Sequence, residues 1–161
     1  MKTPKLRAVN IKWSPDIDDA IDTIIDKYSH KAAAKLLNMT VKDYVRLDDD
    51  ERVGRLYKYF KKNPNRTIDV LNIPRQMDIP LYGEQSVFAD DSDLMDYLSD
   101  QTGWLLDGFD LETNMSPDDA GDLFRALGIK KELSQEEENV REAALTLLVL
   151  LKRCSYKIIE E

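Results

Sequence analysis

Apolar residues recur every three or four positions along most of this chain, a spacing typical of amphipathic helices. The pair Ser14-Pro15 predicts the start of a first helix, which carries Ile21 and Ile24 on one face. Start and stop signals predict further helices over 30–37, 41–47, 49–62, 90–103, 117–127 and 135–153. The last of these is apolar on most sides, which indicates either a central place in a core or half of a dimer interface.

The middle of the chain has a different pattern, with three prolines or glycines and short β-type pieces. We expect short strands at 67–73 and 81–88, a further one near 104–112, and an irregular or extended lead-in over 1–13. The predicted fold is mainly α, with α+β as the alternative: a helical bundle of about six helices with one or two short strands in the middle. The expected core residues are Ile21, Ile24, Leu37, Leu56, Phe60, Leu98, Leu123, Leu127, Leu147, Leu148 and Leu151.

Charged residues are distributed unevenly along the 161 residues. The whole chain carries a formal net charge of −8, yet residues 29–66 hold ten Lys or Arg against five acids. Residues 67–161 hold eight Lys or Arg against 21 acids. We therefore expect a basic N-terminal helical lobe over 1–66 and an acidic C-terminal lobe over 67–161, or one compact domain that contains both.

The cysteine count and the apolar runs of the sequence indicate where in the cell the protein is expected. The single cysteine, Cys154, allows no intramolecular disulfide and suits a reducing compartment, so we expect a cytoplasmic protein. The N-terminus lacks the apolar run of a signal peptide. The longest apolar run, 145–151, is far shorter than the roughly 20 residues that span a bilayer, so no membrane partner is expected.

The segment 34–46, AKLLNMTVKDYVR, combines four features. Ala34 is small enough for close helix packing, and Asn38 tolerates a left-handed turn. Thr40 can cap the following helix, and Tyr44 takes an inward apolar position on it. With these features, residues 30–47 resemble the helix-turn-helix motif of DNA-binding proteins.

The resemblance implies that the start of the second helix faces base edges and that nearby basic side chains meet phosphates. The expected nucleic-acid-binding residues, all within 30–62, are Lys31, Lys35, Thr40, Lys42, Arg46, Arg52, Arg55 and Lys58. Asp43 departs from this pattern on the reading helix, and the acids 48–51 follow directly after it. Whether those acids neutralise the basic residues decides whether DNA contact is feasible.

The acidic lobe suggests a second kind of partner. Carboxylates interspersed with apolar residues over 90–122 can dock a basic protein surface or imitate a phosphate backbone. The expected protein-binding residues are Asp91, Asp93, Asp96, Asp100 and Trp104. The alternative function is thus an acidic inhibitor or adaptor that never touches DNA. A third interpretation is a homodimer through the 135–153 helix.

Catalytic and metal chemistry have little support in the sequence. His30 is the only histidine, and nothing marks a nucleophile beside it. One histidine and one cysteine make a zinc site improbable, and no glycine-rich phosphate loop is present. We expect no catalytic residue, no metal and no cofactor, and hence a non-enzymatic, regulatory binding protein.

Overall fold

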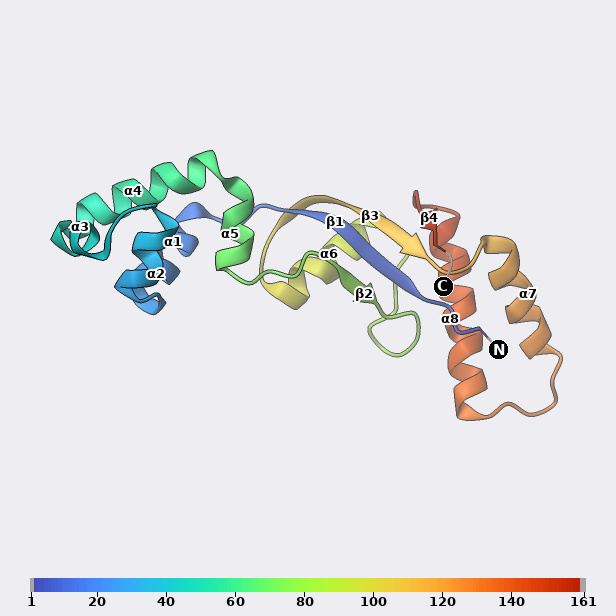
Figure 1. Ribbon diagram of the computed structural model, residues 1–161. Coiled ribbons are helices and arrows are strands. Elements are labelled where there is room, and N and C mark those ends of the chain that lie inside the picture. The colour runs from blue at the N-terminus through green and yellow to red at the C-terminus, as the bar shows by residue number, and fades with distance from the viewer. Residues whose placement is uncertain (1, 160–161) are drawn as a thin grey trace. The chain divides into compact units, whose positions relative to one another are not determined.

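The computed structural model describes residues 2–159 (Figure 1). In chain order its elements are β1 (Leu6–Trp13), α1 (Ile17–Lys27), α2 (His30–Leu36), α3 (Val41–Arg46), α4 (Asp49–Lys62), α5 (Pro64–Val70), β2 (Met77–Ile79), α6 (Asp91–Thr102), β3 (Leu106–Thr113), α7 (Pro117–Gly128), α8 (Gln135–Leu151) and β4 (Lys157–Ile158). The described residues thus form eight helices and one four-stranded sheet. The predicted mainly α helical bundle is wrong, because this is an α+β fold.

The chain folds into two compact units. The helical unit comprises Trp13–Pro74, and the sheet unit comprises the residues up to Lys12 together with those from Arg75 onward. The helical unit is therefore inserted in sequence between β1 and the rest of the sheet unit. These bounds differ from the charge boundary at 66–67, because α5 packs with α1 and α4 in the helical unit.

The strands of the sheet unit lie in the order β2-β1-β3-β4. β1 pairs antiparallel with β2, with Leu6 opposite Ile79, and β3 pairs parallel with β4. The first residues, expected to be an irregular or extended lead-in, therefore include an internal strand of the sheet. Hydrogen bonds from Lys5 N to Asn114 Oδ1, 2.9 Å, and from Thr113 Oγ1 to Lys5 O, 2.8 Å, tie the start of β1 to the end of β3.

An irregularity in β1 hides its alternation from sequence analysis. Leu6 and Ala8 are buried at even positions, whereas Val9 and Ile11 are buried at odd positions. Asn10, between Val9 and Ile11, has a positive φ of 50°. We infer a β-bulge here, because one extra residue moves the buried set from one parity to the other.

A row of alternating charges crosses the sheet. Arg7 on β1 lies opposite Asp78 on β2 and forms an ion pair of 3.1 Å with Glu112 on β3. Glu112 in turn lies opposite Lys157 on β4. Opposite charges on neighbouring strands favour this register, so the row helps to align four strands, two of which are very short.

The predicted strands at 67–73 and 81–88 are wrong. Residues 64–70 form helix α5, with Pro64 in its first turn, and 81–88 contain no strand. β-branched residues suggested strand at 67–73, but Pro64 is well suited to a helix start and Asn72 supplies a left-handed helix end at φ 55°. The strand expected near 104–112 is observed as β3.

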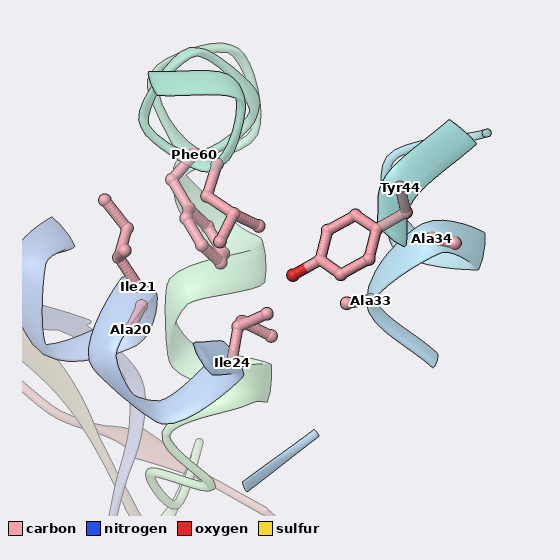
Figure 2. Close-up of a cluster of buried hydrophobic side chains, with 8 residues drawn as sticks. Ala20, Ile21, Ile24, Ala33, Ala34, Tyr44 and Phe60 are labelled. Carbon is pink, nitrogen blue, oxygen red and sulfur yellow. The ribbon is translucent and has the colours of Figure 1, made fainter. Parts of the chain in front are cut away.

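The core of the helical unit comes from α1, α2, α3 and α4 (Figure 2). It comprises Ala20, Ile21, Ile24, Ala33, Ala34, Tyr44, Leu56 and Phe60. Figure 2 shows Tyr44 pointing from its helix toward Ile24 and Phe60. Most of the predicted core residues are buried in their units, whereas Leu37, Leu123 and Leu148 are half-buried.

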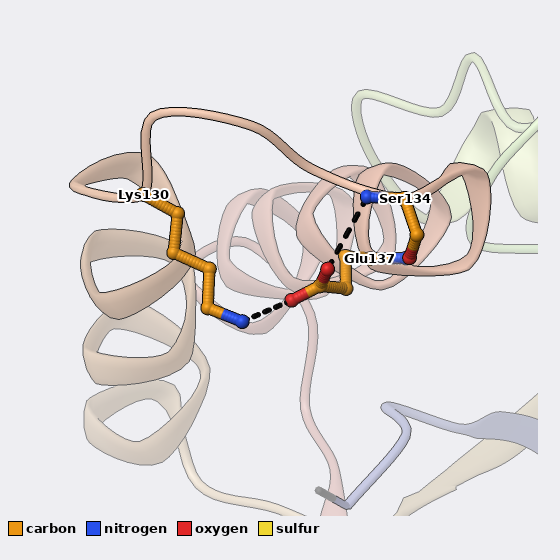
Figure 3. Close-up of polar contacts among 3 residues, drawn as sticks. All are labelled: Lys130, Ser134 and Glu137. Carbon is orange, nitrogen blue, oxygen red and sulfur yellow. Dashed lines mark hydrogen bonds and ion pairs between the residues drawn. The ribbon is translucent and has the colours of Figure 1, made fainter.

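The sheet unit also contains a helical hairpin, in which α7 packs against α8. Ser134 and Glu137 form a capping box at the start of α8, and Lys130 contacts the Glu137 carboxylate (Figure 3). The hydrogen bond from Lys130 holds the pKa of Glu137 below its ordinary value, and Ser134 contributes. These contacts fix the connection between the two helices.

Candidate nucleic-acid interface

The segment that resembles a helix-turn-helix motif lies wholly inside the helical unit. α2 ends at a turn in which Asn38 adopts a left-handed φ of 57°. Met39 N donates to Ala34 O at 2.9 Å and Asn38 N donates to Lys35 O at 3.1 Å. These two bonds make a Schellman turn, which satisfies carbonyls that the helix end leaves free. The left-handed turn expected at Asn38 is confirmed.

The helix after the turn begins as predicted. Thr40 accepts a hydrogen bond from Asp43 N, 3.1 Å, and caps α3. Tyr44 is 2 % exposed and its ring lies 5.7 Å from that of His30 on α2. Because α2 and α3 pack through these side chains, the outer surface of α3 has a defined orientation on its neighbour.

The basic side chains of this unit lie on the outer surfaces of their helices. Lys31 and Lys35 are one turn apart on α2, opposite the buried alanines, and Lys42 and Arg46 are one turn apart on α3. Among the described residues, six of these side chains are exposed and form no ion pair: Lys31, Lys35, Lys42, Arg46, Arg55 and Lys58.

The acids that follow α3 stabilise the start of α4. Asp48 accepts from Glu51 N at 2.8 Å, and Glu51 accepts from Asp48 N at 3.4 Å, so the two form a capping box at the start of α4. Asp49 and Asp50 occupy the first turn of α4, where the helix dipole favours negative charge. In the described part of the chain, none of these acids is bonded to the basic side chains.

Arg52 differs from the other basic residues. It is half-buried, and its guanidinium carbon lies 4.8 Å from the centre of the Tyr44 ring. Its Nη2 donates to Val45 O at 3.2 Å. Sequence reasoning assigned Arg52 to phosphate contact and missed this packing, because both partners lie on the preceding helix. The short connection between α3 and α4 is the one sequence signal for it.

The acidic residues proposed for protein binding do not act as one group. Asp91 interacts with Cys154, and Asp93 accepts from Ala89 N at 2.7 Å. Asp96 and Asp100 are exposed, one turn apart on α6, whereas Trp104 is half-buried. Two of the four aspartates therefore serve local structure, and Asp96 with Asp100 remains as the exposed acidic pair.

A groove of about 580 Å³ lies at one end of the sheet, lined by residues from all four strand ends. Its polar walls are paired internally: Arg7 with Glu112, and Asn114 with the backbone of Lys5 and Thr3. The other lining carboxylate, Asp78, lies two strands from Glu112, about 10 Å at ordinary strand spacing. That separation does not bring the two carboxylates together as a pair.

Helix α8 uses most of its apolar surface inside the sheet unit. Its buried residues are Val140, Ala143, Ala144, Leu147, Leu150 and Leu151. Leu145 and Val149 remain exposed on the outer side. A homodimer through this helix would have only this narrow stripe available.

Over residues 2–159, none of the helices combines the length and the apolar character needed to span a bilayer. The same range holds no group of three His, Cys, Asp or Glu side chains arranged to hold a metal ion. Comparisons with protein-family models, with curated proteins and with solved structures find no match to this chain.

Proposed function

We propose that this chain is a non-enzymatic regulatory protein that binds duplex DNA through α2, α3 and α4. The observation that carries the proposal is the set of six exposed basic side chains that form no ion pair within the described residues. Unpaired, solvated Lys and Arg can replace the counterions of a phosphate backbone, which is the main source of affinity for DNA.

The geometry of α2, the turn and α3 also supports DNA binding. The Schellman turn at Asn38 and the cap at Thr40 place two short helices in sequence, with Lys42 and Arg46 on the outer side of the second. In the family that this segment resembles, such a helix enters the major groove. Asp43 on the same helix opposes phosphate approach, so the basic pair must outweigh it.

The alternative function, an acidic inhibitor or adaptor, is favoured if the basic residues of the helical unit are scattered or neutralised by the acids at 48–51. Asp48 and Glu51 bond to each other's backbone instead, which weakens that alternative. The exposed pair Asp96 and Asp100 is the feature that favours it. We also propose a cytoplasmic location, since one buried free thiol suits a reducing compartment.

The test is fluorescence anisotropy of the whole chain with labelled duplex and single-stranded DNA over a salt series. We expect affinity for the duplex that falls as salt rises, with a slope of about 0.9 for each phosphate neutralised. Changing Lys31, Lys35, Lys42 and Arg46 to alanine together should reduce the affinity and lower that slope.

A matched control removes the same charge from the sheet unit. Lys2, Lys131, Lys152 and Arg153 are exposed, and their replacement by alanine should leave affinity and slope nearly unchanged. Equal losses in both quadruple variants would indicate a general charge effect and no defined interface. Absence of binding at low salt, where attraction is strongest, would refute the proposed function.

A further inference from the structure

Arg52 has a different environment from every other basic residue of the proposed interface. The Nε atom of Arg52 is buried and has no hydrogen-bond partner within the described residues. Its Nη2 donates to Val45 O, and its guanidinium carbon lies over the Tyr44 ring. A guanidinium held this way is not free to follow a phosphate.

The two contacts act on the same short helix. Val45 O is one of the last carbonyls of α3, which have no partner inside the helix, and a cation there also favours the helix dipole. Tyr44 is the buried residue of α3, contacted by His30 from α2 and by Arg52 from α4. Arg52 therefore fixes both the side chain and the C-terminal backbone of α3.

We propose that Arg52 is a positioning residue, which clamps α3 onto the helical unit so that Lys42 and Arg46 are presented in one orientation. This inference rests on the proposed function for its effect on DNA, and on the contacts of Arg52 alone for its effect on α3. Arg52 contributes no phosphate contact of its own.

The experiment compares Arg52→Lys and Arg52→Met with Arg55→Lys and Arg55→Met in the whole chain. Arg55 lies three residues further along α4, is exposed, and forms no ion pair among the described residues. Lysine keeps the charge but lacks the planar fork that reaches the ring and the carbonyl together. Methionine keeps much of the apolar stem and removes the charge.

Hydrogen exchange of the free protein tests the clamp without DNA. Both Arg52 variants should speed exchange of the amides of α3 by about tenfold, the effect of losing a charged hydrogen bond, while the amides of α1 stay protected. The Arg55 variants should exchange like the original chain. Because α1 is measured in the same molecule, general unfolding is distinguished from local release of α3.

DNA binding then tests the positioning role. Both Arg52 variants should weaken duplex binding by a similar factor with the salt slope unchanged, whereas Arg55→Met should lower the slope by about 0.9 and Arg55→Lys should not. If Arg52→Lys binds normally and Arg52→Met loses slope, Arg52 is a phosphate contact and the inference is wrong. Unchanged α3 exchange also overturns it. If no chain binds DNA, the proposed function fails, and the exchange result still decides the clamp.

Discussion

At the scale of single residues, the fold changes the acidity of the Cys154 thiol. Burial raises the pKa of its thiol to about 12, and the hydrogen bond with Asp91 and the charges of Asp91 and Asp90 contribute. The folded chain thus favours the protonated thiol. This contribution to stability is complete below the ordinary thiol pKa and is lost as the pH rises above it.

The rate of alkylation by iodoacetamide reports how much of the Cys154 thiol is ionised and accessible. At pH 8.5 the native chain should react far more slowly than the denatured chain, because only the thiolate attacks. Asp91→Asn should speed the native reaction, although burial, the larger cause, keeps part of the protection. The control Asp96→Asn removes an exposed charge from the same helix and should have no effect. Equal rates for native and denatured chains would contradict this prediction.

Helix starts show which local contacts can be predicted. The cap predicted at Thr40 is confirmed, because its hydroxyl bonds to an amide only three residues on. Asp48 and Ser134 cap α4 and α8 over the same short distance. The start at Ser14-Pro15 was misplaced, since the observed cap of α1 is Asp16, which accepts from Asp18 N. Several suitable residues stood in a row there, and local preference alone did not rank them.

At the scale of elements, β1 is distinguished by the positive φ of Asn10. The Asn10 side chain donates to Asp110 on β3 at 3.0 Å, so the residue supplies both the left-handed backbone and a cross-strand bond. An element with this irregularity has no clean alternation of period two. Sequence analysis therefore described it only as an irregular or extended lead-in.

Substitutions on β1 test the bulge by chemical denaturation. Asn10→Val should destabilise the chain by roughly 2 kcal/mol, because a β-branched residue is strained at positive φ and the bond to Asp110 is lost. Asn10→Gly, which accepts this φ, should cost less. Lys12→Val on the same strand is the control and should be tolerated at its exposed position. Equal losses in Asn10→Val and Lys12→Val would refute a special backbone at Asn10.

The same turn chemistry ends two helices, α2 and α5, although the sequence predicted a left-handed turn only at Asn38. Asn72 closes α5 as Asn38 closes α2, with Ile73 N donating to Ile68 O at 3.1 Å. A Leu-Asn pair stands at both turns and is the sequence signal for the end of α5. The β-branched residues of 67–73 favoured a strand instead, so the prediction there was wrong.

At the scale of the whole molecule, the helical unit has its own core and closed ends. Trp13 Nε1 donates to Pro74 O at 2.7 Å, so the first and last residues of this unit meet. Inserted segments whose ends lie close together are tolerated by the surrounding unit and can fold on their own. The proposed DNA-binding residues all belong to this one unit.

Residues 12–75 as a separate chain should therefore fold. We expect a helical circular dichroism spectrum, cooperative thermal unfolding and duplex binding with the salt slope of the whole chain. Phe60→Ala is the control, because removing this fully buried ring costs about 3–5 kcal/mol and should abolish cooperative unfolding in so small a unit. A fragment without cooperative unfolding would show that the unit depends on the rest of the chain.

The sequence by itself determined most of the helix ends and most of the buried residues, because caps, turns and helical spacing are decided within a few neighbouring positions. Only the tertiary structure decided the sheet, since the bond between Arg7 and Glu112 joins residues 105 positions apart and no local pattern records that pairing. It also decided the place of Arg52, whose charge suggested a phosphate contact until Tyr44 and Val45 were found beside it. Short-range hydrogen bonds are encoded locally, whereas strand pairing and side-chain packing depend on which distant segments meet.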